Sequence, residues 1–283
     1  MAIFILQIST VKLQNSLQPL FYVSIINLSL IYFKSLTLRI FLQNNMTLLS
    51  VNINKVATLR NSRGGNVPDL LKVAKDLQEF GAQGITIHPR PDERHIRYED
   101  ARNLPKVVKT EFNIEGNPTT KFLNLVCEVK PTQVTLVPDA EDAITSSAGW
   151  NIKKHAKFLK SVIDKLKIEG IRTSIFVDPD ISIIEAAFET GTDRIELYTE
   201  NYAKTYNLNR ENGITPYILA AEKATELGIG VNAGHDLNLK NLAYFAQNIP
   251  DLLEVSIGHA LISESLYLGF KNVIPKYLEC LVN

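Results

Sequence analysis

The stretch "VPDLLKVAKDLQEFGAQGITIH", residues 67–88, contains both kinds of element that decide the fold. Its N-terminal half is periodic, and a single helical face carries Leu70, Leu71, Ala74, Leu77 and Phe80. Gly81 then supplies a stop for that helix. Residues 84–88 form a short β-branched run that is typical of a buried strand. A helix, a glycine and a buried strand in this order indicate a parallel sheet with crossover helices.

The same unit recurs from Met46 to the end of the chain. Strand-like runs lie at residues 48–54, 84–88, 111–116, 133–138, 172–178, 194–199, 228–235 and 253–259. Helical periodicity appears between them at residues 67–81, 153–170, 181–191 and 216–228. The runs look continuously buried rather than alternating, as in parallel sheets. Eight units favour a closed (β/α)8 TIM barrel with outer helices, and no G-x-G-x-x-G follows the first run to favour the alternative, an open doubly wound sheet.

Composition limits the partners. The chain has 283 residues, 45% hydrophobic and 21% charged, which is enough for one large core. Lys plus Arg equals Asp plus Glu at 30 each, so no net field attracts nucleic acid or an anionic membrane. The two cysteines, Cys127 and Cys280, lie in apolar segments and are expected to be reduced thiols of a cytoplasmic protein; a disulfide is the alternative.

The first 45 residues differ from the rest. They contain no Asp, Glu or Gly, and their only charges are Lys12, Lys34 and Arg39. Their longest apolar stretch, residues 20–33, is shorter than a membrane span and is interrupted by Ser and Asn. We expect residues 1–45 to be an extraneous or poorly ordered extension, Met46 to be the true start, and residues 46–283 to form a single barrel domain. A membrane-associating extension is the alternative.

Polar residues stand where the predicted strands end. They are Asn52, Asn54, His88, Arg90, Glu115, Asp178, Glu196, Thr199, Asn232, His235 and His259, the last preceded by Gly258. For the fourth strand the candidate is Thr135 or the loop beyond Pro138. In a (β/α)8 barrel all these ends meet at one face, where active sites lie. A single loop histidine is more often structural, but three histidines that converge with a carboxylate favour acid–base chemistry. His155 belongs to a solvated helix face and receives no role.

A phosphate site is favoured over a metal site. Metal-dependent barrel hydrolases typically begin with two histidines two positions apart, and here Arg90 follows His88 at that spacing. The seventh and eighth strands end in "VNAGHD" and "SIGHAL", where glycines let backbone N–H groups approach an anion before a helix begins. "TLRNSRGG" after the first strand adds Arg60 and Arg63 as a second anion contact.

Six motifs carry a resemblance to a known family. They are "VNINKVATLRNSRGG", "GITIHPRPDERHI", "FNIEGN", "LVPDAEDAITSSAGW", "VNAGHDL" and "SIGHALI". Together, and in this order, they resemble the pyridoxine 5'-phosphate synthases, which close the pyridine ring in one vitamin B6 pathway. The resemblance runs from about Leu48 to the C-terminus. Residues 1–45 have no counterpart.

The resemblance implies a reaction and a set of roles. The family condenses 1-deoxy-D-xylulose 5-phosphate with 3-amino-2-oxopropyl phosphate, releases phosphate and water, uses no cofactor or metal, and forms octamers built from dimers. By motif position, His88 is similar to the proton acceptor, Glu115 to a second acid–base group and His235 to the proton donor. Residues similar to the substrate contacts are Asn52, Arg63, Asp236, Gly258 and His259 for the amino ketone phosphate, and Arg90, His95 and Thr145 for the deoxyxylulose phosphate. Asn54 and Lys55 are also expected to bind substrate. Thr145 lies on a loop that in the family closes over the site.

Three positions, in two motifs, depart from the family pattern. Asn54 and Lys55 stand where the family has Asp-His, and Asp236 stands where it has Gly. A carboxylate beside a phosphate dianion is repulsive, so we expect the Asp236 side chain to turn away and only its backbone N–H to donate.

Two other functions are compatible with a phosphate-binding barrel. A different phosphate-handling barrel isomerase or aldolase would need a strand-end lysine for an imine, and Lys55 is the only candidate. A non-catalytic B6-phosphate binding protein would not need His88, Glu115 and His235 together. The presence of all three favours an enzyme.

Overall fold

The computed structural model of the chain describes residues 46–139 and 148–282. The barrel and its helices belong to the unit that begins at Met46.

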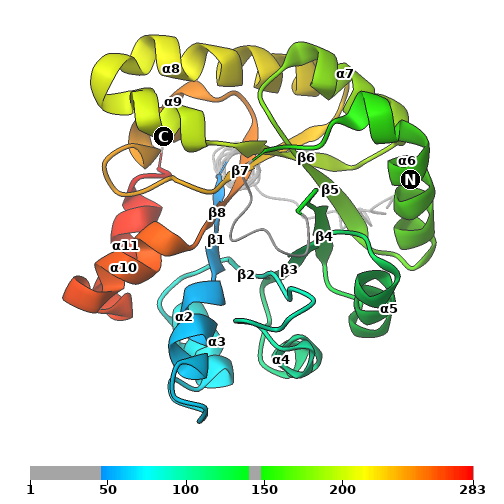
Figure 1. Cartoon of the computed structure of the whole chain (residues 1–283). Coiled ribbons are helices and arrows are strands. Elements are labelled where there is room, and N and C mark those ends of the chain that lie inside the picture. Colours follow the sequence, from blue (N-terminus) through cyan, green and yellow to red (C-terminus); the bar gives the residue numbers. More distant parts are fainter. Residues whose placement is uncertain (1–45, 140–147, 283) are drawn as a thin grey trace, which may run out of the picture. The chain divides into compact units, whose positions relative to one another are not determined.

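Eight parallel strands close into a barrel in chain order (Figure 1). They are β1 (Leu48–Asn52), β2 (Gly84–Ile87), β3 (Glu111–Gly116), β4 (Gln133–Leu136), β5 (Arg172–Val177), β6 (Arg194–Tyr198), β7 (Gly230–Gly234) and β8 (Leu252–Ile257). β1 also pairs with β8, with Ser50 opposite Ser256, so the sheet has no free edge. The predicted (β/α)8 barrel is confirmed, and an open sheet is excluded.

Helices surround the barrel (Figure 1). They are α2 (Asn54–Asn61), α3 (Leu70–Glu79), α4 (Tyr98–Asn103), the 3₁₀ helix η1 (Leu104–Lys106), α5 (Thr120–Val129), α6 (Ile152–Ile168), α7 (Ile181–Thr190), α8 (Glu200–Glu226), α9 (Leu242–Asn248), α10 (His259–Leu268) and α11 (Phe270–Glu279). The start of α3 is fixed by the Asp69 carboxylate, which accepts from the N–H groups of Leu71 and Lys72.

The helix after β6 begins earlier than predicted. The apolar pattern indicated a start at Pro216, whereas α8 begins at Glu200. It comprises two helical segments, because Asn209 has non-helical φ and ψ angles and its side chain accepts from the N–H of Asn212. The first segment was missed because its sequence is mostly polar.

The strands are buried almost throughout, as predicted, but apolar and polar residues alternate along them. Val51, Ile87 and Ile114 belong to the hydrophobic core, which also includes apolar side chains of the surrounding helices. The residues between them face the barrel interior and are polar, and they hydrogen-bond across strands: Ser50 Oγ lies 2.8 Å from Thr86 Oγ1, and Thr135 donates to Asn113 Oδ1 at 3.1 Å. Hydrogen bonds of this kind offset the cost of burying these polar side chains. Both the apolar and the polar positions are buried, so each strand reads in the sequence as one continuously buried run.

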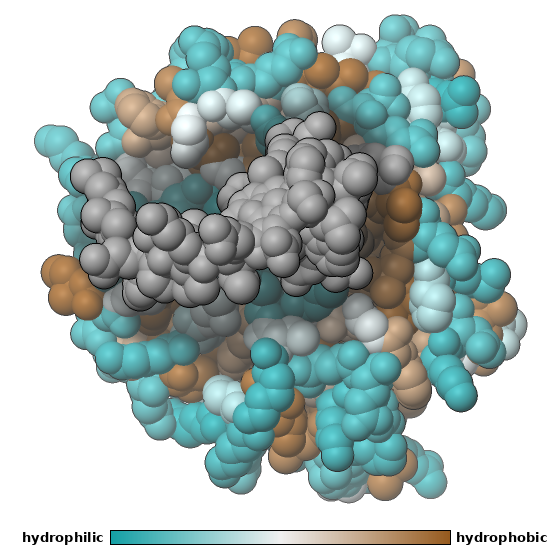
Figure 2. Space-filling view, turned by 180° about the vertical axis from the view of Figure 1, so that it is seen from behind, coloured by the Kyte–Doolittle hydropathy of each residue, from teal (hydrophilic) through white to brown (hydrophobic). Residues whose placement is uncertain are grey.

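The outer face is largely hydrophilic. Seen from behind, polar side chains cover most of the rim, with scattered apolar ones between them (Figure 2). Within residues 46–139 and 148–282, no helix is both long and apolar enough to cross a bilayer. Cys127 and Cys280 are both free thiols.

Candidate active site

A cavity of about 360 Å³ lies at the carboxyl ends of the strands. The following predicted site residues line it: Asn52, Asn54, Lys55, His88, Arg90, His95, Glu115, His235, Asp236, Gly258 and His259. Glu196, which was noted only as a strand-end residue, also lines it, and so do three residues that sequence reasoning missed, Val137, Phe176 and Ser256.

One predicted residue is not brought to this cavity. Arg63 is exposed beyond the end of α2 and does not line it. Thr145 lies outside the described residues, so its place stays a prediction. Among residues 46–139 and 148–282, no group of three His, Cys, Asp or Glu side chains is arranged to hold a metal ion.

Asparagine side chains set the junction between β1 and β2. Asn52 Oδ1 accepts from the N–H of Asn54, and Asn54 Oδ1 accepts from the N–H of His88 at 2.9 Å. Asn52 Nδ2 also donates to Glu115 Oε2 across the barrel mouth at 3.3 Å. These bonds position His88 and Glu115 relative to β1.

The polar segment after β2 is held from behind by the end of α2. Arg60 is 1% exposed and donates to both carboxylate oxygens of Asp100, at 2.6 and 2.8 Å, and to the carbonyl of His95. Asn61 Nδ2 donates to that same carbonyl at 2.8 Å. The expectation that Arg60 contacts an anionic substrate is therefore wrong, because its guanidinium is buried in an internal ion pair.

The two histidines after β2 are kept neutral. Burial, reinforced by the nearby Arg90, moves the pKa of His88 well below its usual value. Burial and Arg90 likewise lower the pKa of His95 to about 4. His95 Nδ1 accepts from the N–H of Ile96 at 2.8 Å, which leaves the ring proton on Nε2. A neutral His88 near pH 7 is suited to accept a proton.

Glu115 and Glu196 have the opposite shift. Burial, with repulsion from Asp139 and Glu254, raises the pKa of Glu115 to about 8. Burial, with repulsion from Glu115, also raises the pKa of Glu196 well above its usual value. Glu115 Oε2 lies 3.9 Å from His88 Nδ1. At neutral pH a largely protonated carboxyl group therefore stands beside a neutral imidazole.

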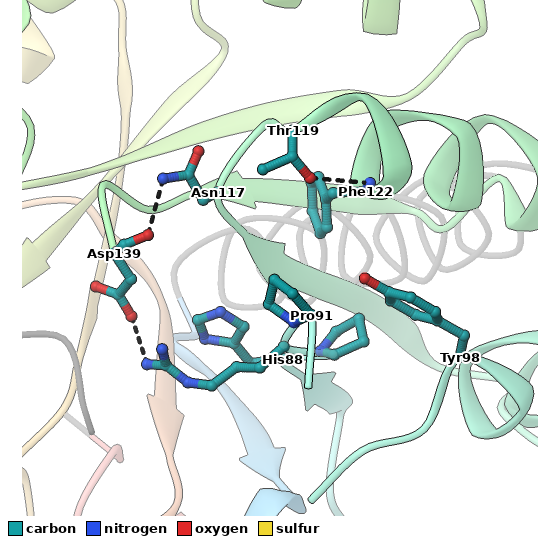
Figure 3. A pocket seen from close by; sticks show the side chains of 9 residues that line it. His88, Pro91, Tyr98, Asn117, Thr119, Phe122 and Asp139 are labelled. Carbon is teal, nitrogen blue, oxygen red and sulfur yellow. Dashed lines mark hydrogen bonds and ion pairs between the residues drawn. The ribbon is translucent and has the colours of Figure 1, made fainter. Parts of the chain in front are cut away.

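Arg90 is held by a buried ion pair. Its Nη2 lies 2.6 Å from Asp139 Oδ2, and the two side chains are 4% and 5% exposed. The carbonyl of Asp139 accepts from Asn117 Nδ2 at 2.8 Å, so Asp139 lies between Asn117 and the guanidinium (Figure 3). These residues, with Tyr98, Phe122 and others, line a second cavity of about 160 Å³ that also includes His88. The ion pair links the segment after β2 to the segment after β4.

The ends of β7 and β8 face the same cavity as His88 and Glu115. His235 directly follows β7, and its ring packs perpendicular to that of Tyr198, with centroids 4.9 Å apart. Gly258 is the N-cap of α10, and a Cβ there would lie 3.2 Å from Asn52 Cβ. A helix starts directly after β8 as predicted, but the helix after β7 starts only at Leu242, because residues 236–241 form a turn.

Asp236 lines the cavity, and its carboxylate lies 2.8 Å from His235 Nδ1. That hydrogen bond lowers the pKa of Asp236. The expectation that the carboxylate turns away from a bound phosphate stays a prediction.

The fold and this cavity define a (β/α)8-barrel protein with acid–base side chains gathered at the carboxyl ends of its strands. Solved barrels share the fold: N-(5'-phosphoribosyl)anthranilate isomerase from Pyrococcus furiosus matches with a TM-score of 0.56 at 13% identity, covering 83% of this chain and 98% of that one. The chain belongs to the family of the pyridoxal phosphate biosynthesis protein PdxJ, whose model matches residues 49–283.

Curated relatives agree with this family. Pyridoxine 5'-phosphate synthase of Flavobacterium johnsoniae is 68% identical over 234 residues, which is 83% of this chain and 99% of the relative. The enzyme of the same name from Parabacteroides distasonis is 62% identical over 236 residues, again 83% of this chain and 99% of the relative. The resemblance inferred from the six motifs is confirmed.

Proposed function

We propose that this protein is a pyridoxine 5'-phosphate synthase, which condenses 1-deoxy-D-xylulose 5-phosphate with 3-amino-2-oxopropyl phosphate and releases phosphate and water. The observation that carries the proposal is the gathering of His88, Glu115 and His235 in one cavity. Family membership and the similarity to enzymes of that name support it. The reaction belongs to vitamin B6 biosynthesis and requires neither cofactor nor metal.

The protonation states support a division of labour. Imine formation, phosphate elimination and dehydration all move protons at carbons next to a carbonyl or imine. His88 is neutral and accepts a proton from such a carbon, while Glu115, with a pKa near 8, gives and takes protons near neutral pH. His235, which follows β7, donates a proton to the leaving oxygen.

Charged and backbone groups take the two phosphates. Lys55 and Arg90 supply positive charge beside His95 and Asn54 for the deoxyxylulose phosphate. The start of α10, with Gly258 and His259, supplies backbone N–H groups for the amino ketone phosphate next to Asn52. Further contacts from Asp236 (through its N–H), Arg63 and Thr145 complete the proposed substrate set.

The direct test mixes the full chain with both substrates without added metal and follows pyridoxine 5'-phosphate and phosphate together. Equal appearance of both, lost in His235→Ala, is expected. Binding of pyridoxine 5'-phosphate without turnover would instead identify a binding protein. An isomerase or aldolase that forms an imine on Lys55 is disfavoured because that side chain is exposed, and such a lysine needs a desolvated site.

We also propose a cytoplasmic homo-octamer, a tetramer of dimers. Two free cysteines suit a reducing compartment. Leu266 and Tyr267 at the end of α10 are 75% and 92% exposed, as expected of residues that a second subunit covers. Light scattering should give eight times the chain mass of 31.7 kDa, and a monomer would contradict this assembly.

A further inference from the structure

His235 and Asp236 form a hydrogen-bonded pair inside the candidate site. Their side chains are adjacent in sequence, yet Nδ1 of the imidazole and Oδ2 of the carboxylate lie only 2.8 Å apart. The side chains are 25% and 42% exposed, so the pair lies at the mouth of the cavity rather than in its interior. Both residues line that cavity.

The backbone is built to make this pairing possible. His235 has a φ of +92°, a left-handed conformation that is uncommon for residues other than glycine. The carbonyl of Asp236 accepts from Asn241 Nδ2 at 3.2 Å and from Asn238 Nδ2 at 3.4 Å, and the N–H of Leu237 donates to the carbonyl of His235. The turn after β7 is therefore fixed by its own hydrogen bonds.

The pair also fixes the ring. Tyr198 packs against the imidazole at 89°, and the carboxylate holds Nδ1. The hydrogen bond lowers the pKa of Asp236, so the carboxylate is ionised at neutral pH and can only accept. Nδ1 must then carry the hydrogen, which makes Nε2 the atom that exchanges a proton with a substrate.

We infer that Asp236 is a positioning residue that holds the His235 ring in one orientation with a hydrogen on Nδ1, so that Nε2 is the atom that takes up a proton from water or substrate and then donates it. The inference rests on the proposed role of His235 as proton donor. It also explains how a carboxylate is tolerated near a phosphate site: its charge is committed to the imidazole, as in other carboxylate–histidine pairs. The position thus does more than replace the glycine of the family pattern.

The tautomer can be observed directly. The chain has only five histidines, so ¹⁵N-histidine labelling of the full chain gives a small set of ring signals in magic-angle-spinning spectra. The His235→Gln variant lacks the two ring nitrogen signals of residue 235, so comparison with it assigns them. For the neutral ring we expect wild-type His235 as Nδ1–H, Asp236→Asn to keep that form through its amide oxygen, and Asp236→Leu to lose it. Nε2–H as the main form in the wild type would overturn the inference.

Kinetics test the consequence. Loss of orientation in Asp236→Leu should lower kcat about 10-fold, a fraction of the 10²–10⁴-fold that a positioned acid contributes, with KM for both substrates nearly unchanged. Asp236→Asn should fall between that variant and the wild type. Asp251→Asn is the matched control, because it removes the same charge from an exposed left-handed position before β8, where Asn is tolerated.

A raised KM with unchanged kcat would make the Asp236 side chain a substrate contact and overturn the inference. Equal losses in the Asn and Leu variants, with a lowered melting temperature, would also overturn it, because they would indicate a structural role. If the wild type gives no turnover, the proposed function fails, whereas the tautomer spectra still decide whether Asp236 orients His235.

Discussion

At the scale of single residues, Glu115 couples activity to stability. Its pKa rises from an ordinary value of 4.5 to about 8 in the folded protein, mainly through burial. Between these values the folded protein binds more protons than the unfolded chain, so this group favours folding less as pH rises. In Glu115→Gln this contribution to stability does not change with pH, because an amide side chain does not titrate.

We predict that the melting temperature of Glu115→Gln, measured relative to the wild type, increases steadily from about pH 5 to pH 8. Its activity should fall by about 100-fold or more, because Gln cannot exchange a proton. Glu222→Gln, on an exposed helix face, serves as the control with a flat difference. A flat difference for Glu115→Gln as well would show that the carboxyl group is not held protonated.

Residue types could be predicted from the sequence better than their environments. Strand ends placed His88, Glu115 and His235 together because the barrel topology alone brings those ends to one face. The role of Arg60 could not be predicted, because its partner Asp100 lies 40 residues away in α4, and nothing local distinguishes a buried ion pair from an anion contact. The polar interior of the barrel could not be predicted for a similar reason. The alternation of apolar and polar residues along a strand can be recognised only once it is known which side chains face inward.

At the scale of elements, the Arg90–Asp139 ion pair joins the segments after β2 and β4. Asp139→Asn should lower the free energy of unfolding by about 3 kcal/mol, because it leaves a buried guanidinium without its charge partner. Glu128→Gln removes the partner of Arg102 in an exposed pair and should change stability little. Urea unfolding of both variants measures the contrast. Equal effects would mean that water reaches the Arg90 pair as freely as the surface pair.

The connection before α6 packs tightly against β5. A Cβ on Gly149 would lie 2.4 Å from the backbone nitrogen of Asp178, and backbone atoms cannot shift as a side chain can. Gly149→Ala should therefore lose about 1–3 kcal/mol of stability. Gly65→Ala is the control, since nothing lies within 4 Å of its Cβ position. Calorimetric melting compares the two, and a neutral Gly149→Ala would mean that this connection is loosely packed.

At the scale of the whole molecule, the closed barrel could be predicted from the sequence, but the full set of residues that line the cavity could not. Eight recurring strand–helix units favoured a closed barrel because that repeat number is the pattern of the (β/α)8 barrel, and the observed strand order agrees. Val137, Phe176 and Ser256 also line the cavity but were not predicted. They lie one or two positions from the candidate residues at the strand ends, and whether their side chains face inward depends on the register of the strands.

Residues 1–45 are predicted to be dispensable for the barrel. All eight strands lie between Leu48 and Ile257, and the ring is closed by the pairing of β1 with β8. A chain that starts at Met46 should therefore keep the melting temperature and the kcat of the full chain. A chain that starts at Ile53 lacks β1 and should not form the barrel, because β2 and β8 would then present unpaired edges. Circular dichroism melts and the synthase assay compare all three chains. Loss of folding in the Met46 chain would show that the first 45 residues contribute to the barrel, and the proposed domain boundary would be wrong.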